Sequence, residues 1–100
     1  MKIGKSTLAH YEEMLVITME ECGELVQACS KFIRTGGKAR YLENLREEIG
    51  DVVTMIEIIK QSGLVTEQHI QDRIKVKTNK LEKWSNLFNH QENTDENQVH

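Results

Sequence analysis

The sequence predicts an all-α fold, a bundle of three main helices per chain that is completed by dimerisation or by a dimer of dimers. Over three long stretches, apolar residues recur at steps of three and four, which is the period of an α-helix. The chain has no proline and only 5% aromatic residues, a composition that suits helices better than sheets. With 100 residues it can bury only a modest core, so self-association is expected.

The first helix is expected to begin at a cap on Ser6 or Thr7 and to end around Arg34, before the break at Thr35-Gly36-Gly37. Additional apolar residues widen its stripe, so we expect burial both by its own chain and by a partner. Its expected seam, the set of residues that faces the neighbouring helix, comprises Leu8, Tyr11, Leu15, Cys22, Leu25, Cys29 and Phe32.

The second helix is expected from about Tyr41 to Gln61, and Ser62-Gly63 ends it. Thr66 should cap a third helix that reaches roughly Leu87. Residues 1–88 would then form the domain, and the polar tail at 89–100 is expected to be disordered. The expected seams are Leu42, Leu45, Ile49, Val52, Ile56 and Ile59 on the second helix, and Ile70, Ile74, Lys77, Leu81, Trp84 and Phe88 on the third.

Charge and composition exclude several classes of partner. A net charge of -3 argues against binding to a nucleic-acid polymer. No stretch approaches the roughly 18 uncharged apolar residues that a membrane span needs, and no signal sequence stands at the N-terminus. Cys22 and Cys29 are expected to be small core residues in a reducing compartment, which predicts a cytoplasmic location.

A repeated acidic motif is the strongest functional signal in the sequence. Residues 20–26 and 47–53 both read Glu-Glu-x-Gly-acid-apolar-Val. Helical spacing places Glu21 and Glu24 one turn apart on one helix, and Glu48 and Asp51 one turn apart on the next. A single motif of this kind could be a solvent-facing charge pair. Its repetition in register favours four converging carboxylates, and like charges so close together call for a cation.

The position of the motif predicts where that site lies. Each acid pair stands one residue before a pair of seam residues, so the carboxylates should meet at the edge of the interface between the helices. Gly23 and Gly50 would allow the two backbones to approach closely there. Oxygen ligands favour Mg²⁺, Mn²⁺ or Ca²⁺ over zinc, and no histidine has the Glu-x-x-His spacing of di-iron bundles. Such a site suits polyphosphate chemistry.

The Glu20-Glu21-x-x-Glu24 and Glu48-x-x-Asp51 pair resembles the EExxE and ExxD signature of the MazG-type all-α nucleoside triphosphate pyrophosphohydrolases. The similarity spans roughly residues 8–84. It implies cleavage between the α and β phosphates with Mg²⁺, or Mn²⁺ as an alternative, to give a nucleoside monophosphate and pyrophosphate. It also implies a homodimer or homotetramer in which a neighbouring subunit completes the nucleotide pocket.

The resemblance also implies residue roles. The metal ligands would be Glu21, Glu24, Glu48 and Asp51, while Glu20 and Glu47 would orient or activate water. A later segment resembles the family's nucleotide-contacting stretch, which makes Lys77, Asn79 and Lys80 substrate-binding candidates.

Other assignments stay open at the level of the sequence. Lys31 flanks the glycine break with other basic residues, either as part of a solvated loop or as part of a mobile loop that binds polyphosphate. Lys77 is either a phosphate ligand or a snorkelling surface residue. Alternative functions are a related pyrophosphatase, such as a dimeric dUTPase or a phosphoribosyl-ATP pyrophosphohydrolase, and a non-catalytic helical dimerisation module.

Overall fold

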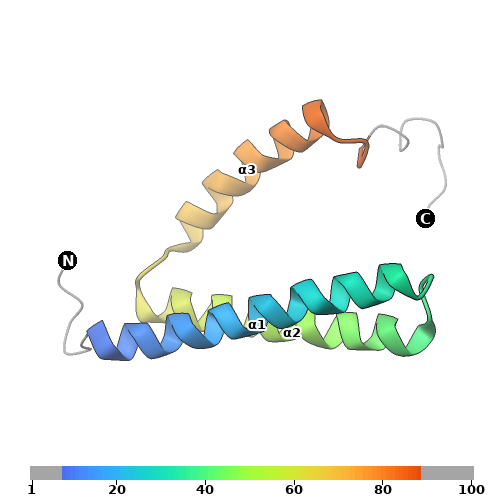
Figure 1. The fold of residues 1–100 in the computed structure, drawn as a ribbon. Helices are drawn as coiled ribbons and strands as arrows, with labels where there is room; N and C mark the ends of the chain where they lie inside the picture. The colour runs from blue at the N-terminus through green and yellow to red at the C-terminus, as the bar shows by residue number, and fades with distance from the viewer. Residues whose placement is uncertain (1–7, 89–100) are drawn as a thin grey trace. The chain divides into compact units, whose positions relative to one another are not determined.

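The computed structural model describes residues 8–88, which form three helices and no strand. Helix α1 spans Leu8–Arg34, α2 spans Ala39–Ser62 and α3 spans Glu67–Trp84 (Figure 1). This confirms the all-α prediction. The described residues belong to two compact units, one up to Leu64 and one from Val65 onward. The expected cap at Ser6 or Thr7 and the expected disordered tail at 89–100 lie outside the described residues.

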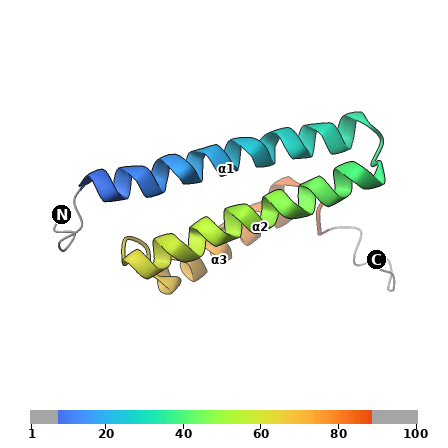
Figure 2. The same cartoon turned by 90° about the horizontal axis from the view of Figure 1, so that it is seen from below.

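Helices α1 and α2 form an antiparallel hairpin and run side by side over most of their length (Figures 1 and 2). The turn between them begins at the predicted break. Gly36 and Gly37 have φ angles of 72° and 84°, and the Gly37 amide donates to the Phe32 carbonyl at 2.9 Å. Glycine adopts these left-handed angles without steric cost, which explains why the helix ends here.

The hairpin core lies towards the start of α1 and the end of α2. Tyr11, Met14 and Met55 are its buried members, and three partly buried residues pack against them. The Tyr11 hydroxyl donates to the Ser62 carbonyl at 3.3 Å, which satisfies one of the carbonyl groups at the end of α2. The packed residues are Ile17, Ile59 and Leu64.

The predicted seam of α1 was partly wrong. Leu15 is 40% exposed, and Cys22 and Cys29 are free thiols on the surface of the chain rather than core residues. The reason is that α1 carries two apolar stripes, which periodicity alone does not separate. We call the buried and half-buried set the inner stripe; on α1 it is Tyr11, Met14, Ile17, Thr18, Glu21, Leu25, Ala28 and Phe32. We call the exposed set the outer stripe; on α1 it is Leu15, Met19, Cys22, Val26, Cys29 and Ile33.

The seam of α2 requires the same correction. Ile49 is 47% exposed and Ile56 is 39% exposed, so neither belongs to the interface within the hairpin. The inner stripe of α2 contains Leu42, Leu45, Glu48, Val52, Met55 and Ile59, and its outer stripe contains Ile49, Val53 and Ile56.

The third helix begins where the sequence predicted and ends earlier. Thr66 accepts a hydrogen bond from the His69 amide at 3.1 Å, and His69 Nδ1 accepts one from the Thr66 amide, which forms a reciprocal cap. The helix ends at Trp84 rather than Leu87 because Ser85 adopts an extended conformation and its hydroxyl donates to the Leu81 carbonyl at 2.7 Å.

The predicted seam of α3 was also partly wrong. Lys77 is exposed, and Ile74 and Trp84 are 48% and 83% exposed. The half-buried face of this unit includes Thr78, where Lys77 was predicted. None of the three described helices combines the length and the hydropathy that a membrane span requires.

Candidate metal centre

Two glutamates stand on the inner stripe of the hairpin, at positions where apolar residues would be expected. Glu21 lies one turn from Leu25 on α1, and Glu48 lies one turn from Val52 on α2. Both are half-buried. The prediction had placed the acids one residue away from the interface, at its edge, and this was wrong: Glu21 and Glu48 belong to the interface itself.

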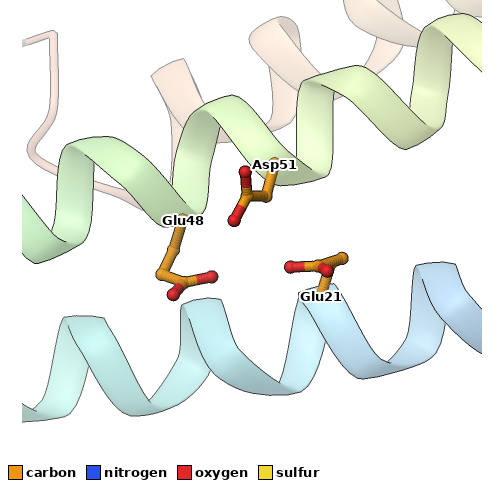
Figure 3. Close-up of side chains that lie close together, drawn as sticks. All are labelled: Glu21, Glu48 and Asp51. Atoms are coloured by element: carbon orange, nitrogen blue, oxygen red, sulfur yellow. The ribbon is translucent and has the colours of Figure 1, made fainter.

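The hairpin brings three carboxylates together. Figure 3 shows the side chain of Glu21 from α1 opposite those of Glu48 and Asp51 from α2, with all three carboxylates between the helices. One oxygen from each lies within 4.8 Å of the other two. This spacing is close to the one at which a single ion would contact all three carboxylates, at the 2 to 2.6 Å typical of Mg²⁺ and Ca²⁺.

These carboxylates are poorly satisfied by the protein. One oxygen of Glu21 and one of Glu48 are buried without a hydrogen-bond partner. A buried carboxylate oxygen without a partner is costly, since it has lost water and gained nothing in return. A cation between the helices would satisfy both oxygens.

Burial and mutual repulsion raise the pKa values of the two interface acids, Glu21 and Glu48. The pKa of Glu21 is raised above its usual value, first by burial and then by the charges of Glu24, Asp51 and Glu20. The pKa of Glu48 is raised first by burial, then by the charges of Glu24 and Asp51, by hydrogen bonding to Glu24 and by the charge of Glu21. The ionised forms of both carboxylates are therefore disfavoured in the folded chain. A cation would relieve the repulsion between them.

The donor set fits a hard divalent cation. It consists of carboxylate oxygens from two helices, partly shielded from water, and the ligand atoms include neither imidazole nor thiolate. This chemistry suits Mg²⁺, Mn²⁺ or Ca²⁺ rather than zinc or copper.

The remaining predicted acids lie around this cluster. Glu24 is exposed, yet it is close enough for its charge to raise the pKa of both interface acids. Glu20 is exposed and acts on Glu21 in the same way. Glu47 is exposed beside Glu48 on α2. Their roles stay predictions.

The expectation for the two motif glycines was wrong for the hairpin. A Cβ atom added at Gly23 or Gly50 would meet no atom within 4 Å. Within the chain, neither glycine is needed for close approach of the helices.

The basic residues around the glycine turn lie at the opposite end of the hairpin from its core. Lys31 is exposed, and it lies ten residues from Glu21 on α1, or about 15 Å along the helix axis. Two neighbours of Lys31 have partners within the chain: Arg34 donates to the Ser30 hydroxyl at 3.0 Å, and the Arg40 guanidinium stacks over the Tyr41 ring at 4.9 Å. A phosphate-binding role for Lys31 stays a prediction.

The predicted substrate residues Lys77, Asn79 and Lys80 are all exposed on α3, in the second compact unit. Their role stays a prediction. Of two predicted aromatic seam residues, Tyr11 is buried in the hairpin core and Trp84 is 83% exposed.

The hairpin also carries an apolar groove that the sequence did not predict, lined mainly by Met14, Ile17, Met55 and Ile58. A signal for it was present. Ile17 lies four residues before Glu21, and Met55 lies four residues after Asp51, so each stands one turn from a clustered acid.

One comparison with known proteins gives a match. A family model described as the MazG nucleotide pyrophosphohydrolase domain matches residues 9–86, which include both acidic motifs and all of α3. No curated protein and no solved structure matches the chain.

Proposed function

This chain belongs to the MazG nucleotide pyrophosphohydrolase family, and from that premise we propose that it hydrolyses ribo- or deoxynucleoside triphosphates with Mg²⁺. The bond cleaved lies between the α and β phosphates. The products are a nucleoside monophosphate and pyrophosphate.

The observation that supports this proposal most strongly is the carboxylate cluster. Three acids from two helices offer oxygens within 4.8 Å of one another, and two of these acids have a buried oxygen with no partner. A solvated charge pair would not bury its oxygens. The cluster therefore favours a metal site over the alternative of a non-catalytic dimerisation module whose acids are simply solvated.

We assign metal binding to Glu21, Glu24, Glu48 and Asp51. Bound Mg²⁺, or Mn²⁺ in its place, would neutralise phosphate oxygens and lower the pKa of a bound water. The exposed acids Glu20 and Glu47 are proposed to orient the attacking water and accept its proton, which is the work of a general base.

The substrate's phosphates need positive charge as well as metal. We propose that Lys77 and Lys80 on α3 supply this charge, that Asn79 adds hydrogen bonds, and that Lys31 contributes at the turn. Flexible lysines are suited to this task because each presents a point charge with three donors.

We further propose that a second copy covers the outer stripe of the hairpin. On α1 this stripe follows steps of four and three from Leu15 to Ile33, the repeat by which helices pack knobs into holes. Met19, Val26 and Ile33 are 64%, 68% and 77% exposed in the single chain. A homodimer, or a homotetramer built from two dimers, would bury them. A cytoplasmic location, in which both cysteines stay reduced, also stays a prediction.

The test is release of pyrophosphate from a panel of ribo- and deoxynucleoside triphosphates, with Mg²⁺ and with EDTA, while the second product is identified. Monophosphate formed only with metal supports the proposal. Including dUTP and phosphoribosyl-ATP separates the related pyrophosphatases. A folded protein that turns over none of these substrates would contradict it.

Two substitutions test whether the activity depends on the carboxylate cluster. Glu48→Gln and Asp51→Asn should each lower kcat by at least about 100-fold, because each removes a metal ligand and leaves the helix intact. Glu43→Gln is the matched control, since Glu43 is an exposed acid on α2 that forms only a surface ion pair with Arg46. Full activity in Glu48→Gln would show that the ligand assignment is wrong.

A further inference from the structure

An open apolar groove of about 220 Å³ lies on the hairpin. Met14 and Met55, which are 5% and 7% exposed, form its nearly buried floor. Its other lining residues are His10, Glu13, Ile17 and Ile58, so none of the lining side chains is a lysine or an arginine. The groove is thus unsuited to an anion and suited to an uncharged, largely apolar group.

This groove lies on the same helix faces as the acidic cluster. On α1, His10, Met14, Ile17 and Glu21 follow one another at steps of four, three and four, so they lie on one helix face. On α2, Asp51, Met55 and Ile58 do the same. The nearest apolar residues are one turn, or about 6 Å along the axis, from the clustered acids.

We propose that the groove binds the aromatic base of the nucleotide whose phosphates are held at the acidic cluster. This inference rests on the proposed function, because it requires a nucleotide at that cluster. The base would lie towards the start of α1, and the phosphates towards Glu21 and Asp51.

Size and chemistry favour a base as the occupant. The groove is smaller than the roughly 300 to 1,000 Å³ of pockets that enclose a whole drug-sized ligand, so it suits one ring system. Methionine side chains adapt to a flat ring, and their sulfur atoms make favourable contacts with aromatic rings. Burial of the ring between the floor and the two isoleucines would also remove apolar surface from water.

The direct test uses isotope-labelled methionine methyl groups in the full-length protein, observed by NMR with Mg²⁺ present. A nucleoside monophosphate should shift the Met14 and Met55 methyl signals upfield, because a ring stacked on them shields them. Ribose 5-phosphate, which lacks the base, should leave both signals in place. Met19, on the outer stripe and 64% exposed, is the internal control.

A blocking variant gives the functional test. Ile58→Trp should fill the groove and raise KM for nucleoside triphosphates at least about tenfold, with little change in kcat, because the acids are untouched. Gln27→Trp adds the same side chain at an exposed position of α1 outside the groove and should leave KM unchanged. The oligomeric state of both variants is measured alongside.

The outcomes separate this inference from the proposed function. If the wild type hydrolyses nucleotides while Ile58→Trp keeps its KM and the Met14 and Met55 signals do not move, the groove does not bind the base and the proposed function stands. If ribose 5-phosphate shifts the same signals, the groove responds to the phosphate site and the inference is overturned. If no nucleotide is hydrolysed, the proposed function itself fails. A change in oligomeric state in Ile58→Trp alone would identify the groove as a protein interface and would also overturn the inference.

Discussion

At the scale of the residue, the decisive feature is the position of Glu21 and Glu48 on the inner stripe. An apolar residue at either position would strengthen the hairpin, since burial of apolar surface stabilises and burial of unsatisfied carboxylates does not. The hairpin keeps acids there whose buried oxygens lack partners. A site of this kind is less stable when empty than when occupied by a cation.

This gives a prediction on stability and pH. Because the pKa of Glu48 is raised in the folded protein, the folded state binds its proton more tightly than the unfolded chain does. That contribution to stability is fully present below the ordinary carboxyl pKa of about 4.3 and is lost as pH rises through the raised value. In EDTA, Glu48→Gln should therefore become increasingly more stable than the wild type as pH rises, as measured by Tm.

Addition of Mg²⁺ should reverse this order of stability between the wild type and Glu48→Gln. Ligand that binds only the folded state raises Tm by mass action, so the wild type should gain more than Glu48→Gln does. Glu43→Gln, the surface control, should behave like the wild type in both buffers. An equal response of all three proteins to Mg²⁺ would argue against a metal at this cluster.

At the scale of the element, α1 is a helix with two apolar stripes that serve different purposes. The inner stripe packs the hairpin, and the outer stripe remains exposed in the single chain. The glycines of the two acidic motifs lie in open space, so their cost in helix stability is not offset by packing within the hairpin.

Two glycine substitutions should therefore have opposite effects. Gly50→Ala should raise the free energy of unfolding by about 0.5 to 1 kcal/mol, because alanine favours the helix and meets no atom within 4 Å. Gly36→Ala, which has equal space but a φ angle of 72°, should lower the free energy of unfolding by about 1 kcal/mol. Chemical denaturation measures both.

The oligomeric state of Gly50→Ala gives a second reading. A destabilised or dissociated Gly50→Ala protein would show that this glycine makes room for a partner chain.

At the scale of the whole molecule, the hairpin buries only part of its apolar surface. Its inner stripe is closed around Tyr11, Met14 and Met55, whereas large apolar side chains on the outer stripe face solvent. A chain of 100 residues gains much from covering such a surface with a second copy.

Substitution on the outer stripe tests this. Val26→Lys places a charge in the proposed interface and should weaken self-association at least about tenfold, because an unpaired buried lysine is costly. Gln27→Lys introduces the same charge at the neighbouring exposed position and should have little effect. Sedimentation measures the association of both variants. A Val26→Lys protein that associates like the wild type would place the interface elsewhere.

The helices and the identity of the acids follow from local signals in the sequence. Proline-free 3,4 periodicity, the glycine break after Thr35 and the cap at Thr66 are local signals, so the predicted helices agree with the structure to within a few residues. The repeated motif likewise singled out Glu21, Glu48 and Asp51, which the hairpin brings together.

Which stripe of each helix faces inward depends on how the helices pack, and the sequence does not give this. Leu15, Cys22 and Ile49 have the same spacing and character as true interface residues, and periodicity cannot tell a face that packs within the chain from one that awaits a partner. Placement of Glu21 and Glu48 on the inner stripe depends on that choice. The groove beside them depends on it too, because a groove forms only where two helices from distant parts of the sequence meet.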